Sequence, residues 1–267
     1  MSLNIYINQK KPLVIIDGSY FIFNRFYSTY KWYKYQDKEF ETDSEDFENS
    51  FIRHLDSDFN KIVKKLKTDM NSIILCMDCP RSEIWRNDIY NKYKASRLPK
   101  LNFNPKIFDI FNNHIKKIKI QQLYFDRLEA DDIVYLIHQK VKYLNKNQSF
   151  VVITNDNDYL QITDKYTKII NMQFKDIRLR GTLNYEIDLL VKIIYGDKGD
   201  NIPKILHGIT KEKAIKIAVM SEEDREKFLI DNKVKDNYEL NKTLISFDRI
   251  PNCLSKSFYD YYNIIII

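Results

Sequence analysis

The sequence predicts an α/β protein in which helices flank a mostly parallel central sheet. Three short apolar runs, at 13–16, 72–77 and 150–153, have the continuous hydrophobic pattern of strands that are buried on both faces. Segments with helical spacing lie between them. Each run leads to at least one aspartate: Asp17, Asp78, Asp156 and Asp158. Because ligands of open parallel sheets bind beyond the carboxyl ends of the strands, we expect these side chains to converge.

The composition favours a soluble protein with an affinity for polyanions. The chain of 267 residues has room for one large domain or two smaller ones. Its 43 Lys and Arg against 37 Asp and Glu leave a net charge of +6, which suits nucleic acid, although coding bias toward Lys, Asn and Ile would give the same excess. Three cysteines are too few for a disulfide framework and indicate a reducing compartment. No signal peptide or long apolar run is present, so we expect a soluble, cytoplasmic protein without membrane contact.

Three segments follow the first strand. Residues 20–35 are rich in aromatics and cations, a pattern that fits base stacking and a helix core equally well. Residues 37–48 are acidic and predict a surface loop. Apolar spacing over 51–66 predicts a helix.

The segment 81–97, after the second strand, predicts a helix with a cationic and aromatic face. The face is formed by residues at i, i+4, i+7, i+8 and i+11: Arg86, Tyr90, Tyr93, Lys94 and Arg97. A solvated charged face would not require tyrosines among the cations, so we favour contact with phosphates and bases.

An acidic helix is predicted from about residue 129, after a helix at 106–120 and a strand at 121–125. On a helix, Glu129 and Asp132 share one stripe with Ile133 and Leu136 and face inward. Burying two carboxylates costs several kcal/mol unless a positive charge compensates them, and a metal could do so. The alternative is that acids merely favour a helix start, where the dipole stabilises them by about 0.3–1 kcal/mol.

The C-terminal third is predicted to be largely helical. A helix at 183–194 leads to a turn-rich loop at 196–201, and Thr210 is a candidate N-cap for the next helix. A capped helix start offers backbone N–H groups to a phosphate. The final run 264–267 is too short for a membrane anchor and is expected to complete a packed element or to mark a truncated end.

The carboxylates form the candidate site. The nine are Asp17, Asp78, Glu129, Asp131, Asp132, Asp156, Asp158, Asp197 and Asp200. Such an oxygen-only set suits Mg²⁺ or Mn²⁺, and two ions about 3.5–4 Å apart could stabilise both the attacking and the leaving oxygen of a phosphodiester.

The chain resembles the 5′-nuclease (flap endonuclease) superfamily. The resemblance rests on motifs in the family's order: IDGS at 16–19, MD at 77–78, WR at 85–86, YKASR at 93–97, EADD at 129–132, NDNDYL at 155–160 and GDKGDN at 196–201. The WR context and the segment LISFDRIP at 244–251 are most similar to phage ribonucleases H of the T4 type.

This resemblance implies a fold and an activity. It implies a PIN-like nuclease domain at residues 1–181, with an arch at about 79–100, and a helical DNA-binding domain of the helix–hairpin–helix type at 182–267. The implied activity is that of a structure-specific 5′-3′ exonuclease and flap endonuclease that removes RNA primers during replication or repair. The implied cofactor is two Mg²⁺ ions, which Mn²⁺ can replace. The implied partners of a monomeric protein are branched or flapped DNA, RNA–DNA duplex, a single-strand DNA-binding protein and a sliding clamp.

The resemblance also assigns roles by matching positions. The first metal would be held by Asp17, Asp78, Glu129 and Asp131, and the second by Asp132, Asp156, Asp158 and Asp200, with Asp197 in the same acidic set. The catalytic cations would be Lys94, Arg97 and Arg86, and the nucleic acid would be bound by Tyr90, Tyr93, Lys198, Lys204, Lys211 and Lys213. The segment 203–208 retains one glycine where the family usually repeats glycines, which argues against a potassium (K⁺) site there.

Two other functions remain open at the level of sequence. A PIN-type single-strand endoribonuclease shares acidic strand ends, although the cationic arch and the segment after Gly181 favour the 5′-nuclease. A non-catalytic nucleic-acid-binding replication protein would be expected to have lost motif acids, and all are present.

Overall fold

The computed structural model describes residues 3–36, 40–98, 102–181 and 184–267. Residues 1–2, 37–39, 99–101 and 182–183 lie outside this description. They include parts of the predicted acidic loop, the predicted arch, and the start of the helix predicted from residue 183. No helix in the described ranges is both long and apolar enough to cross a membrane.

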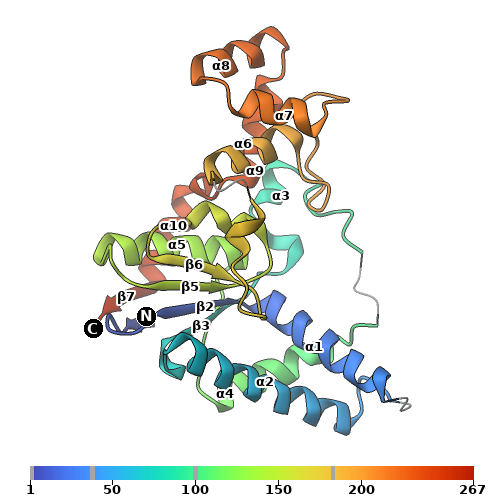
Figure 1. The fold of residues 1–267 in the computed structure, drawn as a ribbon, viewed down its shortest axis with the longest axis vertical. Coiled ribbons are helices and arrows are strands. Elements are labelled where there is room, and N and C mark those ends of the chain that lie inside the picture. Colours follow the sequence, from blue (N-terminus) through green and yellow to red (C-terminus); the bar gives the residue numbers. More distant parts are fainter. Residues whose placement is uncertain (1–2, 37–39, 99–101, 182–183) are drawn as a thin grey trace.

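A parallel five-stranded sheet forms the centre of the molecule (Figure 1). Its order is β4 (Gln121–Leu123), β3 (Ile73–Cys76), β2 (Leu13–Asp17), β5 (Phe150–Ile153) and β6 (Thr167–Ile170). The three predicted buried strands are confirmed, since the hydrophobic residues of β2, β3 and β5 are all inaccessible to water. The strand predicted at 121–125 ends two residues early.

The strand order reverses at β2, which lies between β3 and β5. In register, Asp17 is opposite Cys76, and Ile16 is paired with both Leu75 and Ile153. The segments that follow β2, β3 and β5 therefore emerge together at one edge, where a doubly wound sheet binds its ligand.

Helices α1 (Gly18–Tyr35), α2 (Glu45–Leu66) and α4 (Lys106–Lys117) cover one face of the sheet (Figure 1). The aromatic segment at 20–35 supplies core, because Phe21, Phe26 and Tyr33 are buried. Part of the predicted loop at 37–48 is helical, because Ser44 caps α2 and acids fill its first turn.

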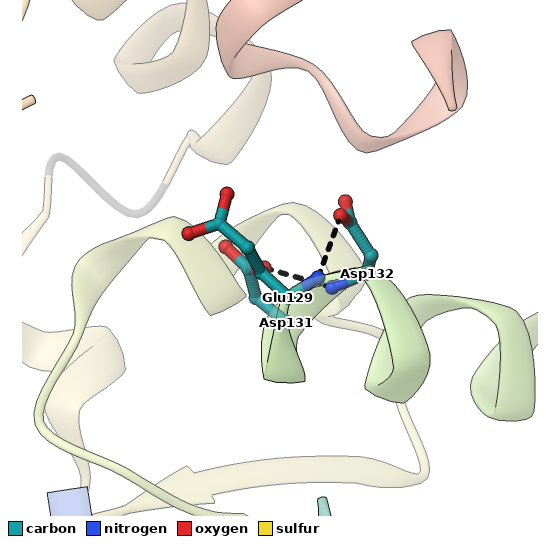
Figure 2. A group of neighbouring side chains, drawn as sticks. All are labelled: Glu129, Asp131 and Asp132. Carbon is teal, nitrogen blue, oxygen red and sulfur yellow. Dashed lines mark hydrogen bonds between the residues drawn. The ribbon is translucent and has the colours of Figure 1, made fainter. Parts of the chain in front are cut away.

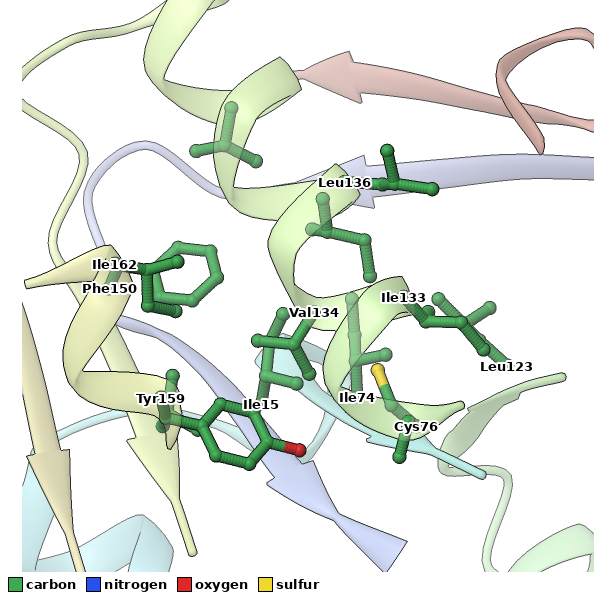
Figure 3. Close-up of a cluster of buried hydrophobic side chains, with 14 of the residues drawn as sticks. Ile15, Ile74, Cys76, Leu123, Ile133, Val134, Leu136, Phe150, Tyr159 and Ile162 are labelled. Carbon is green, nitrogen blue, oxygen red and sulfur yellow. The ribbon is translucent and has the colours of Figure 1, made fainter. Parts of the chain in front are cut away.

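The other face is covered by α5 (Ala130–Leu144) and α10 (Asn252–Tyr261), with a parallel pair of strands beside them, β1 (Leu3–Ile7) and β7 (Tyr262–Ile266). Figure 3 shows side chains of α5 packed on those of the central strands. The first and last strands of the chain lie side by side, since β1 pairs with β7. The expectation that the final isoleucines complete a packed element is confirmed.

A helical unit extends from one end of the sheet (Figure 1) and has its own core. It contains α6 (Tyr185–Tyr195), α7 (Lys211–Ala218), α8 (Glu222–Asp231) and α9 (Lys235–Ile245). Cys79, Ile84 and Tyr93 from the predicted arch belong to this core. α10 and β7 pack in the core of the sheet, and the domain boundary expected at 181/182 stays a prediction.

The prediction of a helix over 81–97 is wrong. Only α3 (Arg86–Ile89) is α-helical, and turns follow it. Lys94 has a left-handed backbone (φ 55°), and its N–H donates to the carbonyl of Asp200 (2.9 Å). This long-range contact overrides the helical spacing and turns the Tyr93 and Lys94 side chains inward. Short 3₁₀ helices complete the fold: η1 (Met70–Ser72), η2 (Arg81–Glu83), η3 (Asn157–Ile162), η4 (Ile177–Arg180) and η5 (Phe247–Arg249).

Candidate active site

The strand ends and the start of α5 bring four carboxylates toward one another. Asp17 caps α1 by accepting from the N–H of Tyr20 (3.0 Å), and its other oxygen accepts from the Thr154 hydroxyl (3.1 Å). Asp78 accepts from the N–H of Ala130 (2.9 Å), which joins the end of β3 to the start of α5. Backbone N–H groups and one hydroxyl therefore hold Asp17 and Asp78 in place.

Asp131 and Asp156 complete this group, which we call the unpaired centre: Asp17, Asp78, Asp131 and Asp156. No Lys, Arg or His in the described ranges forms an ion pair with any of the four. Burial raises the pKa of Asp17 to about 7, with the Asp78 carboxylate adding to the effect. Burial and neighbouring acids also raise the pKa of Asp131 and of Asp156. The centre therefore concentrates negative charge that no direct ion pair in the described ranges neutralises.

Asp132 is engaged differently. Its two oxygens accept from both terminal nitrogens of Arg86 (2.8 Å each), and they also accept from the Trp85 indole (3.0 Å) and the Glu129 N–H (3.2 Å). Figure 2 shows Asp132 with Glu129 and Asp131 around the first turn of α5. Three of these donors share Oδ2 and one reaches Oδ1, so Arg86 already compensates the charge of this fully buried carboxylate. Carboxylate oxygens of Glu129, Asp131 and Asp132 also lie within 4.8 Å of one another, and the metal-ligand role expected for Asp132 stays a prediction.

Arg86 is a buried structural cation. It is 1% exposed, and besides Asp132 it donates to Glu129 (3.0 Å) and to the carbonyl of Leu244 (2.8 Å). The inward stripe predicted for α5 is confirmed, because Glu129, Asp132, Ile133 and Leu136 are all buried. The compensating positive charge for Glu129 and Asp132, however, is an arginine 43 and 46 residues away in sequence.

The other predicted cations also pair with acids. Lys94 contacts Glu129 and lies 3.9 Å from Asp200, while Arg97 contacts Asp200. Burial alone would lower the pKa of Lys94, but Glu129 and Asp200 outweigh it and the pKa is raised. The Tyr93 hydroxyl donates to Glu129 (3.0 Å). Lys94 and Tyr93 are buried, whereas the Arg97 side chain is 44% exposed and faces solvent beside the acids.

Lys192 of α6 is a site residue that the sequence interpretation missed. It contacts Asp158 and lies 2.7 Å from Asp197. The available signal was a single cation in the otherwise apolar second half of α6, five positions before Asp197.

The residues expected to bind duplex lie in the loop 196–209 and at the start of α7. Lys198, Lys211 and Lys213 are exposed, and Thr210 caps α7 by accepting from the N–H of Lys213 (3.2 Å), as predicted. The loop 196–209 joins α6 to α7, which pack together. Only glycine fits position 196, because φ is +74° and an added Cβ would lie 2.5 Å from the carbonyl oxygen of Ile202. Lys204 donates to a loop carbonyl at Ile209 (2.8 Å) instead of extending freely.

Comparisons with known proteins agree with this architecture. The family model "5′-3′ exonuclease, N-terminal resolvase-like domain" matches residues 12–186. The chain is 27% identical over 247 residues to ribonuclease H of Enterobacteria phage T4, covering 83% of this chain and 80% of that protein. It is 25% identical over 219 residues to a 5′-3′ exonuclease of Bacillus subtilis, covering 77% of this chain and 69% of that protein.

Solved structures show the same fold. The bacteriophage T5 flap endonuclease, in a complex with DNA and metal ions, superposes with a TM-score of 0.65 at 16% identity, covering 94% of this chain and 97% of that one. The T5 5′-exonuclease with bound zinc superposes with a TM-score of 0.63 at 16% identity and the same coverage. The predicted fold class, a mostly parallel sheet with a helical region after it, is confirmed.

Proposed function

The chain belongs to the 5′-3′ exonuclease family and is a nuclease, and from this premise we propose that it is Mg²⁺-dependent and removes RNA primers and flaps from the 5′ ends of branched DNA and RNA–DNA duplexes. The observation that carries the proposal is the unpaired centre. Four carboxylates without an ion-pair partner would be strongly destabilising unless the protein binds a cation, and three of them, Asp17, Asp131 and Asp156, have a pKa raised first by burial and then by neighbouring acids.

The donor set fits a hard divalent ion. Asp17, Asp78, Asp131 and Asp156 offer only carboxylate oxygens, which Mg²⁺ and Mn²⁺ prefer. A bound ion would supply an acidified water and would stabilise charge on the phosphodiester oxygens. The protein orients these acids through the Tyr20 and Ala130 N–H groups and the Thr154 hydroxyl.

The cations have separate roles in this proposal. Arg97 combines exposure with a position beside Asp200, so it is suited to contact the phosphate that is cleaved. Lys94 approaches the acids from a buried position and holds Glu129. Arg86 is fully buried and holds Glu129 and Asp132, so we propose a positioning role for it in place of a catalytic one.

Substrate shape is the proposed basis of specificity. Two surfaces are available: the loop with Arg97 beside the acids, and the exposed lysines at the start of α7. The first suits a single strand and the second suits duplex backbone, because phosphate contacts position nucleic acid without reading its sequence. The monomeric state, the partner proteins, and a cytoplasmic location stay predictions.

Cleavage of 5′-labelled flap and RNA-primed duplexes tests the proposal. Wild-type protein should release short 5′ products with Mg²⁺ and none with EDTA, and Asp156→Asn should bind the flap but not cleave it. An internally labelled single-stranded RNA tests the endoribonuclease alternative. Equal cleavage of that RNA and of the flap, or full activity of Asp156→Asn, would overturn the proposal.

A further inference from the structure

Lys192 lies inside the second acidic cluster of the site. Its ammonium contacts Asp158, which follows β5, and Asp197, which follows α6. Carboxylate oxygens of Asp158, Asp197 and Asp200 lie within 4.8 Å of one another, a spacing at which three acids could hold one cation. Lys192 therefore bridges two of the three potential ligands of a metal.

The charges of this cluster are already compensated. Lys192 pairs with Asp158 and Asp197, and Arg97 pairs with Asp200, whose second oxygen lies 3.9 Å from Lys94. Side-chain exposures of 25% for Lys192, 16% for Asp158 and 24% for Asp197 place the bridge largely out of water. The unpaired centre differs in this respect, since none of its acids has such a partner in the described ranges.

A divalent ion would have to expel the ammonium to enter this cluster. Expelling it breaks two short ion pairs and leaves Lys192 as a half-buried cation without a partner, which costs free energy in a site of low water content. The cluster as it stands therefore does not fit a second metal ion.

We propose that Lys192 takes the place of the second metal ion, so that the protein binds one divalent ion at the unpaired centre and fills the Asp158–Asp197–Asp200 cluster with its own ammonium. This inference rests on the proposed function.

An ammonium differs chemically from a metal ion. It cannot acidify a water as a divalent ion does, but it offers three N–H donors from a point charge. Two donors face Asp158 and Asp197, and the third has no partner in the described part of the chain. Lys192 thus fixes both acids and retains one donor for an anionic oxygen of the substrate.

Counting bound ions tests the inference without measuring catalysis. Mn²⁺ binding to the full chain, measured by equilibrium dialysis and by the loss of free-ion electron paramagnetic resonance signal, should saturate at about one ion per chain. Lys192→Met should raise this to about two, because it frees the three carboxylates, while Lys192→Arg should stay at about one. Lys142→Met is the matched control, since Lys142 forms a similar half-buried pair with Asp164 (3.1 Å) away from the site.

Asp158→Asn gives an independent result in a protein that keeps Lys192. It should leave the count at about one, whereas a true second metal site would lose an ion. Two ions on the wild type, or an unchanged count in folded Lys192→Met, would overturn the inference. Failure of the proposed function is distinguishable: if the unpaired centre holds no metal, the wild type binds none and Lys192→Met binds about one.

Discussion

Replacing Asp17 with asparagine should stabilise the metal-free protein above neutral pH. Burial and Asp78 raise the pKa of Asp17 from an ordinary value of about 4 to about 7. A raised pKa in the folded state means that the folded protein binds the proton more tightly. This stabilisation is complete below about pH 4 and is lost as the pH rises through about 7.

The magnitude follows from the pKa difference. Three pH units correspond to about 4 kcal/mol of unfolding free energy. Asp17 is partly exposed, so solvent screens part of this energy, and we expect about 2 kcal/mol. Asparagine carries no charge at any of these pH values, and its side-chain oxygen can still accept from the N–H of Tyr20 at the start of α1.

Urea unfolding followed by circular dichroism, in EDTA at pH 5 to 8, measures the effect. Wild type should lose about 1.3 kcal/mol more than Asp17→Asn over this range, because about two thirds of the full effect falls above pH 5, and the exposed control Asp43→Asn should follow wild type. Adding Mn²⁺ at about a hundred times its dissociation constant should stabilise wild type by about 2.7 kcal/mol and the variant by much less. Parallel pH curves, or a variant less stable than wild type at pH 8 in EDTA, would refute the electrostatic reasoning.

Three further predictions concern the cations. Arg86→Met should lower the unfolding free energy by about 3–5 kcal/mol, because it leaves Asp132 buried without its partner; an unchanged urea midpoint would contradict this. Arg97→Ala should slow single-turnover flap cleavage by about 10²-fold at saturating DNA, as measured by rapid quench; a loss confined to affinity would show a positioning contact only. Charge reversal at Lys211 and Lys213 should reduce the slope of log binding constant against log salt concentration for junction DNA by about 0.9 per lost phosphate contact, with single-strand binding spared. Equal losses of affinity on junction and single-stranded DNA would rule out the division into two binding surfaces.

The strands and their terminal acids were predictable because the signals are local. A run such as 150–153 is apolar at every position, and only a strand buried on both faces requires that pattern over so short a length. The start of α2 was missed by six residues, since the cap at Ser44 and not the apolar spacing determines where the helix begins.

The failed helix at 81–97 shows the limit of periodicity. The spacing of its cations and aromatics fits a helix, but the segment adopts turns because its backbone is hydrogen-bonded to a loop about a hundred residues away in sequence. Lys94 donates its N–H to Asp200, and the Asn201 amide donates to the carbonyl of Lys92 (2.9 Å). No local pattern contains these partners.

The same limit explains why the nine acids could be identified as a set but not separated by role. Every acid has the same functional group, so its role depends on which cation reaches it. Asp132 receives Arg86 across 46 positions, and Asp158 receives Lys192 across 34, whereas Asp17 receives only backbone and hydroxyl donors. An acid that already has a buried cation gains little from a metal and would lose its partner on binding one. An acid held by neutral donors has no ion-pair partner to offset its burial, and burial together with Asp78 raises the pKa of Asp17. The acids without an ion pair are therefore the ones that we propose as ligands of the metal.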